Sequence, residues 1–187
     1  FKLSKLKEVS IIQKGTSITK NITEEGYIPV IAGGQQPAYY HNKFNREGDT
    51  ITVSSSGAYA GFINYFTIPI FASDCTTIKS KDETIVTTRF LFLVLKSLQK
   101  DFYALQKGGG QPHVYGKDFQ EIEIPLPPLE VQKEIVAEIE GYQKIIDGAR
   151  QIVDNYKPRI TIDPKWDVVE LGDSRYFNVE AGGTPNT

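Results

Sequence analysis

Polar side chains suited to DNA recognition gather in three segments that are rich in glycine, amide or hydroxyl residues. These segments run from Lys14 to Lys20, from Gly33 to Arg46 and from Gln106 to Lys117, and a serine cluster before Tyr59 adds a fourth. Arg and Lys can pair with guanine and Asn or Gln with adenine, while lysines and hydroxyl groups also bind phosphate. The candidate DNA-contacting residues are Lys14, Thr16, Ser17, Lys20, Gln35, Gln36, Tyr39, Asn42, Lys43, Arg46, Ser55, Tyr59, Lys107, Gln111, His113, Tyr115 and Lys117.

Each of these segments also has a plain structural explanation. Gly33-Gly34 and Gly108-Gly109-Gly110 can be simple turns, because neither fits a nucleotide-binding glycine pattern. His41 and His113 belong to a class of loop residue that more often satisfies local hydrogen bonds than reads bases. The segments favour DNA contact as a group, while for any single residue the structural role stays open.

The sequence lacks the residue patterns expected of an enzyme's active site. It lacks the Asn/Asp-Pro-Pro-Tyr/Phe motif of adenine methyltransferases, and two histidines with one cysteine are too few for a zinc site or a nucleophilic triad. Asp49, Asp74, Asp82 and Glu83 are not accompanied by a nuclease-like Glu-x-Lys element, so a solvated surface explains them better. We expect no catalytic residues, no metal and no cofactor on this chain.

A long helix is expected to follow the proline-rich stretch from Pro125 to Gln132 and to end at Lys157-Pro158. Its apolar positions alternate in steps of four and three, the pattern of a coiled-coil seam. About 28 helical residues would measure roughly 42 Å. Three heptads alone are marginal in water, so we expect a partner helix from a second copy or from another part of the parent chain. The helix-pairing candidates are Ile135, Ile139, Tyr142, Ile146, Ala149, Val153 and Tyr156.

The helix also carries two glycines, Gly141 and Gly148, seven residues apart on one face. They are either tolerated surface glycines or a strip where another helix backbone approaches closely.

The residues before this helix predict an α+β domain with a mixed sheet. Strands are expected at 9–14, 27–31, 50–53 and 76–78, with a strand pair within 59–70 and a last strand at 119–124. Helical spacing begins near Thr88, which can act as the N-cap, and Gly108 can end that helix. The predicted organisation is a globular domain at 1–127, the long helix at 128–158 and a further segment at 159–187.

Charge divides the 187 residues unevenly. Residues 1–120 hold 14 Lys and Arg against 10 Asp and Glu, whereas residues 121–187 hold 7 against 13. The mildly basic part is compatible with a polyanion, and the acidic helix suits a protein partner better than DNA. No apolar run is long enough to span a membrane, no signal peptide opens the sequence, and the lone Cys75 suits a reducing compartment. We therefore expect a cytoplasmic location, and we expect the sequence to be part of a longer protein.

After the long helix the sequence repeats features of its own opening. The opening from Phe1 to Val9 is echoed by Trp166–Asp173, and Gln13-Lys14-Gly15-Thr16 is echoed by Ala181-Gly182-Gly183-Thr184. The order is thus a domain, a spacer helix and a domain start.

Together with the segment from Gly108 to Val114 and the run from Ile122 to Gln132, these openings make the chain resemble the specificity subunit of type I restriction-modification systems. Glu130-Val131-Gln132 stands where members of that family often have a second acidic residue, a small departure. Similar domains also occur fused to the methyltransferase-nuclease chains of other restriction systems.

The resemblance implies a target recognition domain that reads one half of a split site in double-stranded DNA. It also implies that spacer helices pair antiparallel and dock a DNA adenine methyltransferase subunit, which supplies S-adenosylmethionine, and indirectly a restriction subunit. The alternative from the residues alone is a coiled-coil adaptor that binds only protein. Salt-sensitive binding to duplex DNA separates the two hypotheses.

Overall fold

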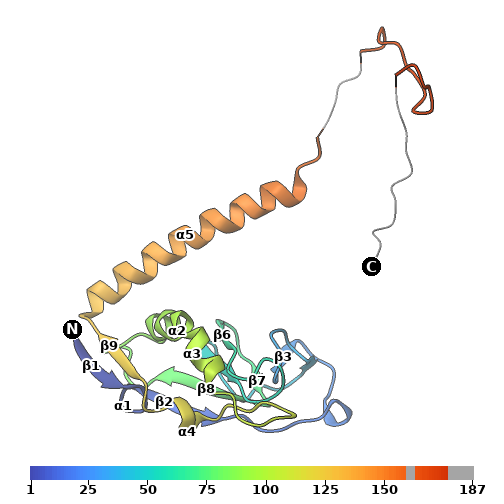
Figure 1. Ribbon diagram of the computed structural model, residues 1–187. Coiled ribbons are helices and arrows are strands. Elements are labelled where there is room, and N and C mark those ends of the chain that lie inside the picture. Colours follow the sequence, from blue (N-terminus) through green and yellow to red (C-terminus); the bar gives the residue numbers. More distant parts are fainter. Residues whose placement is uncertain (159–162, 177–187) are drawn as a thin grey trace. The chain divides into compact units, whose positions relative to one another are not determined.

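A four-stranded antiparallel sheet lies at the centre of the computed structural model, which describes residues 1–158 and 163–176 (Figure 1). One of its two inner strands, β5 (Thr50–Ser54), is buried along its whole length, as its β-branched side chains predict. The expected α+β fold is confirmed. In spatial order the strands are β2 (Ser10–Lys14), β8 (Cys75–Ser80), β5 (Thr50–Ser54) and β6 (Ile63–Phe66).

Two smaller sheets adjoin the central one. In the three-stranded sheet, β3 (Ile28–Ile31) pairs antiparallel with β4 (Tyr39–His41) and parallel with β7 (Phe71–Ala72). In the two-stranded sheet, β1 (Lys2–Lys5) pairs antiparallel with β9 (Glu123–Leu126). The first and last strands of the domain are therefore neighbours, which brings its two ends together.

Short helices connect and cover these sheets. They are α1 (Leu6–Val9), the 3-10 turn η1 (Lys20–Ile22), α2 (Thr88–Ser97), α3 (Gln99–Ala104) and α4 (Gly116–Phe119). The apolar side of α2 enters the main core through Phe90, Leu91 and Leu95. Phe102 of α3 and Phe119 of α4 meet in the same core with ring centroids 5.1 Å apart. These ring contacts explain why the long 98–119 connection stays attached to the sheet.

The expected helix beginning at Thr88 is present, but its N-cap and its extent were predicted wrongly. Thr87 is the N-cap, and its hydroxyl oxygen accepts a hydrogen bond from the Phe90 amide at 3.1 Å. The Thr88 hydroxyl is buried and instead donates to Glu83 Oε1 at 2.5 Å. The backbone leaves the helical region at Leu98, so two helices replace one.

Two strand expectations also need correction. The segment 119–124 is not one strand, because the last turn of α4 holds Phe119 and the strand begins only at Glu123. In the region 59–70, residues 59–62 form a turn and β6 pairs with β5 rather than within the region. In both places tight turns hold the backbone of residues that carry a strand-like apolar pattern.

The long helix α5 (Leu129–Asn155) has 27 residues, close to the expected extent. Gln132, in its first turn, is fully buried and locks the helix to the domain. Its side-chain amide donates to the carbonyls of Ile85 (2.9 Å) and Pro127 (3.0 Å), and its Oε1 accepts from the Thr87 amide at 3.0 Å. An ion pair of 2.7 Å between Arg89 and Glu140 adds a second attachment.

Residues 1–145 and 146–187 form two compact units. Outside α5, the described part of the second unit consists of turns, with Trp166 donating its amide to the Asp163 carbonyl at 2.9 Å. The echo at 181–184 and the linker at 159–162 lie outside the described residues. No helix among residues 1–158 and 163–176 is long and apolar enough to cross a membrane.

Candidate nucleic-acid interface

Three of the polar loops meet at the end of β5. The Ser54 hydroxyl lies 3.4 Å from the Gly34 carbonyl, which ties the 33–36 loop to this end of the sheet. The Gly57 amide donates to the Pro112 carbonyl at 3.0 Å, and the Val114 amide donates to the Ser55 carbonyl at 3.0 Å. Segments that are far apart in the sequence thus share one edge of the domain.

The 14–18 segment reaches the same edge through the turn before β8. The Gly15 amide donates to the Cys75 carbonyl at 2.8 Å, and the Ser55 amide donates to the neighbouring Asp74 carbonyl at 3.1 Å. A β-carbon at Gly15 would lie only 2.1 Å from the Ser73 carbonyl oxygen, so this close approach requires glycine. The glycine therefore sets the distance between the first polar segment and the serine cluster.

A surface hollow of about 220 Å³ lies where these segments meet. Lys14, Ser55, Tyr115 and Lys117 contribute to its lining, so four predicted residues from three separate segments face one space. Lys14 and Lys117 form no ion pair within residues 1–158 and 163–176, which leaves both ammonium groups available to an anion. Such an arrangement suits a phosphate oxygen of a nucleic-acid backbone.

Aromatic rings border the hollow. The rings of His113 and Tyr115 stack with centroids 5.7 Å apart and planes 3° apart. The Lys117 ammonium lies 5.8 Å from the centroid of the Tyr115 ring. The stack gives the exposed Tyr115 a fixed orientation, and it holds Lys117 beside the opening.

Lys107, in contrast, is already neutralised by an acidic neighbour. Its ammonium pairs with Asp118, which also accepts a hydrogen bond from the Tyr115 amide at 2.9 Å. Burial alone would raise the pKa of the Asp118 carboxyl, but the hydrogen bonds from Lys107 and from the Tyr115 amide outweigh it and lower that pKa. Lys107 therefore acts first as a clamp on the loop that follows it.

Several further predicted residues lie exposed on the loops that meet at this edge. Gln111 is at the tip of the 106–117 loop, and its side chain has no hydrogen bond to another described residue. The exposed predicted residues on these loops are Thr16, Ser17, Gln35, Gln36, Tyr59 and Gln111. Their amide and hydroxyl groups are the kind that reads base edges.

A second group of predicted residues lies away from this hollow, around Glu24. The Asn42 amide donates to Glu24 at 2.6 Å, and the Lys43 ammonium lies 3.4 Å from the same carboxylate. These contacts lower the pKa of Glu24, with the Asn42 hydrogen bond as the larger cause. Lys20 lies exposed on the nearby turn η1, and Tyr39 donates its hydroxyl to the Ile18 carbonyl at 2.6 Å.

Two predicted residues are engaged within the domain. The Arg46 guanidinium donates to the Thr77 hydroxyl at 2.9 Å and to the Lys14 carbonyl at 3.0 Å, so it fixes the backbone of the first polar segment. Ser55 is buried, and both its amide and its carbonyl are used in backbone hydrogen bonds. Sequence reasoning also missed Thr76 and Gln120, which line the hollow, since a strand interior and a helix end gave no signal of exposure.

Cys75, the single thiol, cannot serve as a nucleophile at this edge. It is buried, and burial raises the pKa of its thiol to about 12. The thiol therefore stays neutral near pH 7.

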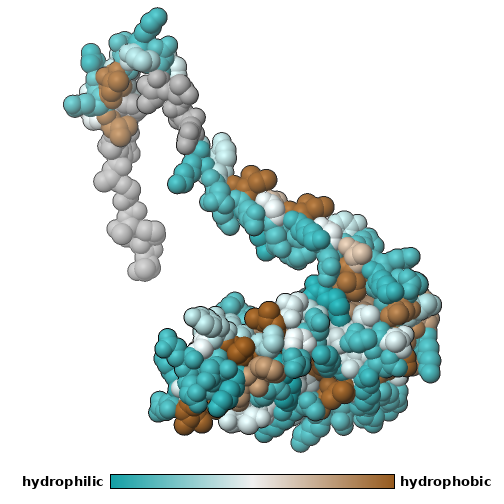
Figure 2. Space-filling model, turned by 180° about the vertical axis from the view of Figure 1, so that it is seen from behind, coloured by the Kyte–Doolittle hydropathy of each residue, from teal (hydrophilic) through white to brown (hydrophobic). Residues whose placement is uncertain are grey.

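The predicted pairing residues of α5 fall into two parts. Ile135 packs against the core of its own domain, and Ile139 borders an apolar groove formed with Phe90 and Val94. From Tyr142 onward the seam is exposed: solvent reaches 59% of the surface of Tyr142 and 73% of the surface of Val153. Brown apolar atoms stand out along the helix in Figure 2.

Sequence reasoning missed part of this apolar stripe. Ile145 and Ile152 are also exposed, and each precedes a seam residue by one position. The signal was present, because both follow the same heptad spacing as Ile146 and Val153.

The chain is similar to a family of DNA specificity proteins along most of its length. The family model of the type I restriction modification DNA specificity domain matches residues 1–153. The chain belongs to this family. The type I restriction enzyme MjaVIII specificity subunit of Methanocaldococcus jannaschii is 32% identical over 130 residues, covering 65% of this chain and 30% of its own length. A putative type I specificity subunit of Mycoplasma pneumoniae is 25% identical over 151 residues, covering 78% and 49%.

Solved structures support the same fold. The type I system S subunit of Mycoplasma genitalium superimposes with a TM-score of 0.72 at 20% identity, covering 82% of this chain and 41% of that one. The HsdS subunit of Thermoanaerobacter tengcongensis gives a TM-score of 0.61 at 20% identity, covering 80% and 39%. The chain thus spans less than half the length of these specificity subunits.

Proposed function

We propose that this specificity-family chain reads one half of a split sequence in double-stranded DNA. The observation that carries the proposal is the convergence of the polar loops at one edge, where Lys14 and Lys117 face a common hollow without ion-pair partners in the described structure. Exposed glutamine and hydroxyl side chains lie on the loops that meet at this edge, and groups of this kind read base edges. Membership of the type I DNA specificity family supports the same assignment.

The proposed organisation follows from this reading. Residues 1–127 form the target recognition domain, residues 128–158 the spacer helix, and residues 159–187 the linker and the start of a second recognition domain. At 1.5 Å per residue the 27 residues of α5 extend about 40 Å, comparable to the roughly 34–36 Å of one DNA turn. A helix of that length can set the separation of two half-sites.

The spacer helix is proposed to bind protein rather than DNA. Its seam is apolar and exposed beyond Tyr142, and residues 121–187 carry 13 Asp and Glu against 7 Lys and Arg. A second spacer helix is the proposed partner of the seam, and a DNA adenine methyltransferase subunit is proposed to dock on the same helices. The restriction subunit would then join through the methyltransferase.

No catalysis is assigned to this chain. Its relatives are specificity subunits, and its only thiol is buried and neutral. The methyl donor and the nuclease chemistry belong to the partner subunits in this proposal. The complex would act in the cytoplasm, where the DNA is.

The exposed seam of α5 supports a second candidate function, an adaptor that binds only protein. Binding of this chain to a duplex, measured from about 50 to 200 mM salt, separates the two. A DNA reader loses affinity steeply with salt through counterion release, with a slope of about 0.9 per phosphate contact. Lys14→Ala and Lys117→Ala should each weaken binding for all sequences and lower that slope by about 1.

The matched control is Lys2→Ala, an exposed lysine on β1 whose side chain makes no polar contact with another described residue and lies outside the hollow. Its slope should stay unchanged. Binding that is absent, or that is insensitive to salt and to both hollow variants, would support the adaptor instead.

A further inference from the structure

The turn that connects β5 to β6 extends from the edge of the domain where the polar loops meet. Ser54, the last residue of β5, pairs with Cys75 at the start of β8. Lys14, the last residue of β2, pairs with the next residue of β8. The turn formed by residues 57–62 therefore lies on the side of the domain that the proposed function assigns to DNA.

The backbone of this turn is held against the domain. Gly57 and Gly61 have φ values of 80° and 87°, in the left-handed region that glycine adopts without strain. A β-carbon at Gly61 would lie 2.6 Å from the Phe102 carbonyl oxygen, so the turn packs closely on α3. The side-chain amide of Gln106 donates to the Ala60 carbonyl at 2.8 Å, and the Ala60 side chain is fully buried. The turn therefore has a defined backbone conformation in the free domain.

Tyr59 is the one bulky side chain at the tip of this turn, because residues 57–61 are otherwise glycine and alanine. It is 45% exposed, and its side chain makes no hydrogen bond or ring contact with another described residue. The other two tyrosines of the candidate interface are engaged, since Tyr39 donates its hydroxyl to a carbonyl and the Tyr115 ring stacks on a histidine. Tyr59 thus presents an aromatic ring without a partner on an anchored turn.

The chemistry of a phenol ring favours contact with base faces over contact with base edges. Its single hydroxyl cannot make the paired hydrogen bonds that distinguish bases at their edges, whereas every base has a face on which an aromatic ring can stack. Side chains that insert between base pairs partly unstack a base step, and pyrimidine–purine steps such as TA and CA/TG open most easily. A β-carbon at Gly57 would meet nothing within 4 Å, so the space beside the ring is open.

We propose that Tyr59 inserts its ring between two base pairs at a pyrimidine–purine step of the recognised half-site. The inference rests on the proposed function, because it requires the loops of this edge to face DNA. Sequence preference at this step would come from the ease with which the step opens, and not from hydrogen bonds to base edges. The anchored turn favours insertion, since little conformational freedom is lost on binding.

The test compares the unchanged chain with Tyr59→Ala and Tyr59→Phe in selection from a randomised duplex pool. The unchanged chain and Y59F should enrich a motif that has a TA or CA/TG step at one fixed position. Y59A should lose the preference at that step, and its affinity for the enriched duplex should fall about 5- to 150-fold, the loss expected for one stacked base. With 2-aminopurine in place of the adenine of that step, fluorescence should rise on binding of the unchanged chain and of Y59F, because the base is unstacked, but not on binding of Y59A.

The matched control is Tyr27→Ala, because Tyr27 is 94% exposed and precedes β3, at the opposite end of that strand from Gly33. This variant should leave the motif and the fluorescence unchanged, and thermal unfolding of each variant shows whether the core has survived. An enriched motif that Y59A retains in full, or 2-aminopurine fluorescence that stays constant when the unchanged chain binds, would overturn insertion by Tyr59 and leave DNA recognition standing. The absence of any enriched motif for the unchanged chain would overturn both proposals.

Discussion

Single residues at the candidate interface show why the partners of a side chain matter more than its residue type. Lys14 and Lys117 line one hollow and form no ion pair within the described residues, whereas Lys107 has the same chemistry but is paired with Asp118. Arginine is the residue type best suited to guanine, but the Arg46 guanidinium donates hydrogen bonds to the Thr77 hydroxyl and to the Lys14 carbonyl. The sequence could identify these polar segments, but it could not show which of the four cations are paired, because partners such as Thr77 are distant in the chain.

Glu8 and Glu121 make the β1 edge sensitive to acid. Hydrogen bonds from Ser4 and from Lys7, respectively, are the largest causes that lower the pKa of each carboxyl below its ordinary value of about 4.3. A group whose pKa is lowered by folding stabilises the folded state above the unfolded pKa, and it loses that contribution as pH falls through the folded pKa. We expect exchange at Lys2–Lys5 to accelerate below about pH 4.3, at a pH where β5 remains protected.

Hydrogen exchange followed by mass spectrometry between pH 6 and pH 3 checks this expectation after correction for intrinsic rates. In E121Q the acid dependence should shrink, because the glutamine cannot titrate. Equal pH dependence for β1 and β5 in the unchanged chain would contradict the assignment.

Among the elements, α5 buries one side chain completely in the domain, that of Gln132. Gln132 bonds to the backbone of Thr87, Ile85 and Pro127, and Thr87 is itself the N-cap of α2. Thr87 therefore joins the start of α2 to the first turn of α5. This arrangement explains why a glutamine follows the Pro-Pro-Leu motif in this sequence.

Gln132→Leu should lower the free energy of unfolding by about 2–4 kcal/mol, because the Thr87 amide and two carbonyls lose a buried partner. Urea denaturation followed by circular dichroism measures the change. The matched control is Gln151→Leu on the exposed part of the same helix, expected within about 0.5 kcal/mol of the unchanged chain. A similar stability for both variants would show that the buried amide contributes nothing.

The exposed seam of α5 predicts self-association of the chain. The double variant I146E/V153E places two charges on the seam and should leave only monomer in sedimentation velocity, while the unchanged chain forms dimers as its concentration rises. K144E/Q151E carries the same spacing on the opposite side of the helix and should still associate. The unchanged chain remaining monomeric at high concentration would rule out pairing of two copies.

The pattern of neighbouring residues predicts elements that depend on local sequence, but not elements that depend on contacts between distant segments. The β-branched run of β5 and the heptad spacing of α5 are properties of neighbouring residues, so both could be located from the sequence. The parallel pairing of β3 with β7 and the order of the central sheet depend on contacts between distant segments. The turn at Phe119 was likewise decided by its packing on Phe102 rather than by local propensity.

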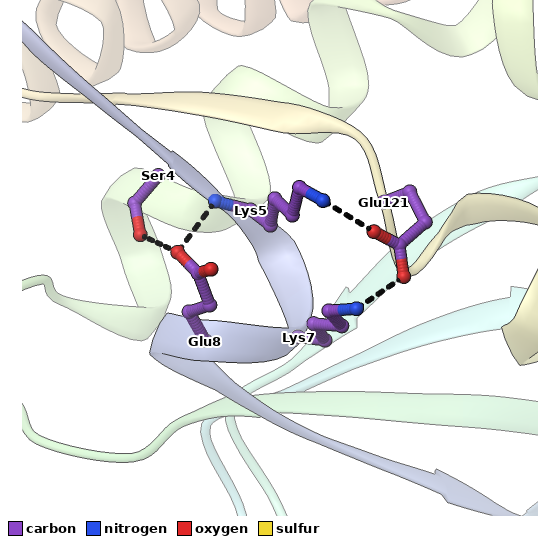
Figure 3. Close-up of polar contacts among 5 residues, drawn as sticks. All are labelled: Ser4, Lys5, Lys7, Glu8 and Glu121. Carbon is purple, nitrogen blue, oxygen red and sulfur yellow. Dashed lines mark hydrogen bonds and ion pairs between the residues drawn. The ribbon is translucent and has the colours of Figure 1, made fainter.

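At the scale of the whole molecule, the chain belongs to the type I DNA specificity family and covers 30% and 49% of the length of two curated relatives. In the first opening Lys5 and Lys7 pair with Glu121, two residues before β9 (Figure 3), whereas the second opening carries Asp167 and Glu170. The echo of the first opening was visible in the sequence, but the structure alone shows which of its lysines meet Glu121.

The central claim, that this chain reads a DNA sequence, is tested most directly by selection from a randomised duplex pool. The chain is incubated with the pool at near-physiological salt, with and without the proposed methyltransferase partner, and the retained duplexes are sequenced. The account predicts a short enriched motif that Gln111→Ala relaxes at one position, with a loss of about 1–3 kcal/mol for the preferred base. Retention without any enriched motif, despite formation of the complex with the methyltransferase, would contradict it.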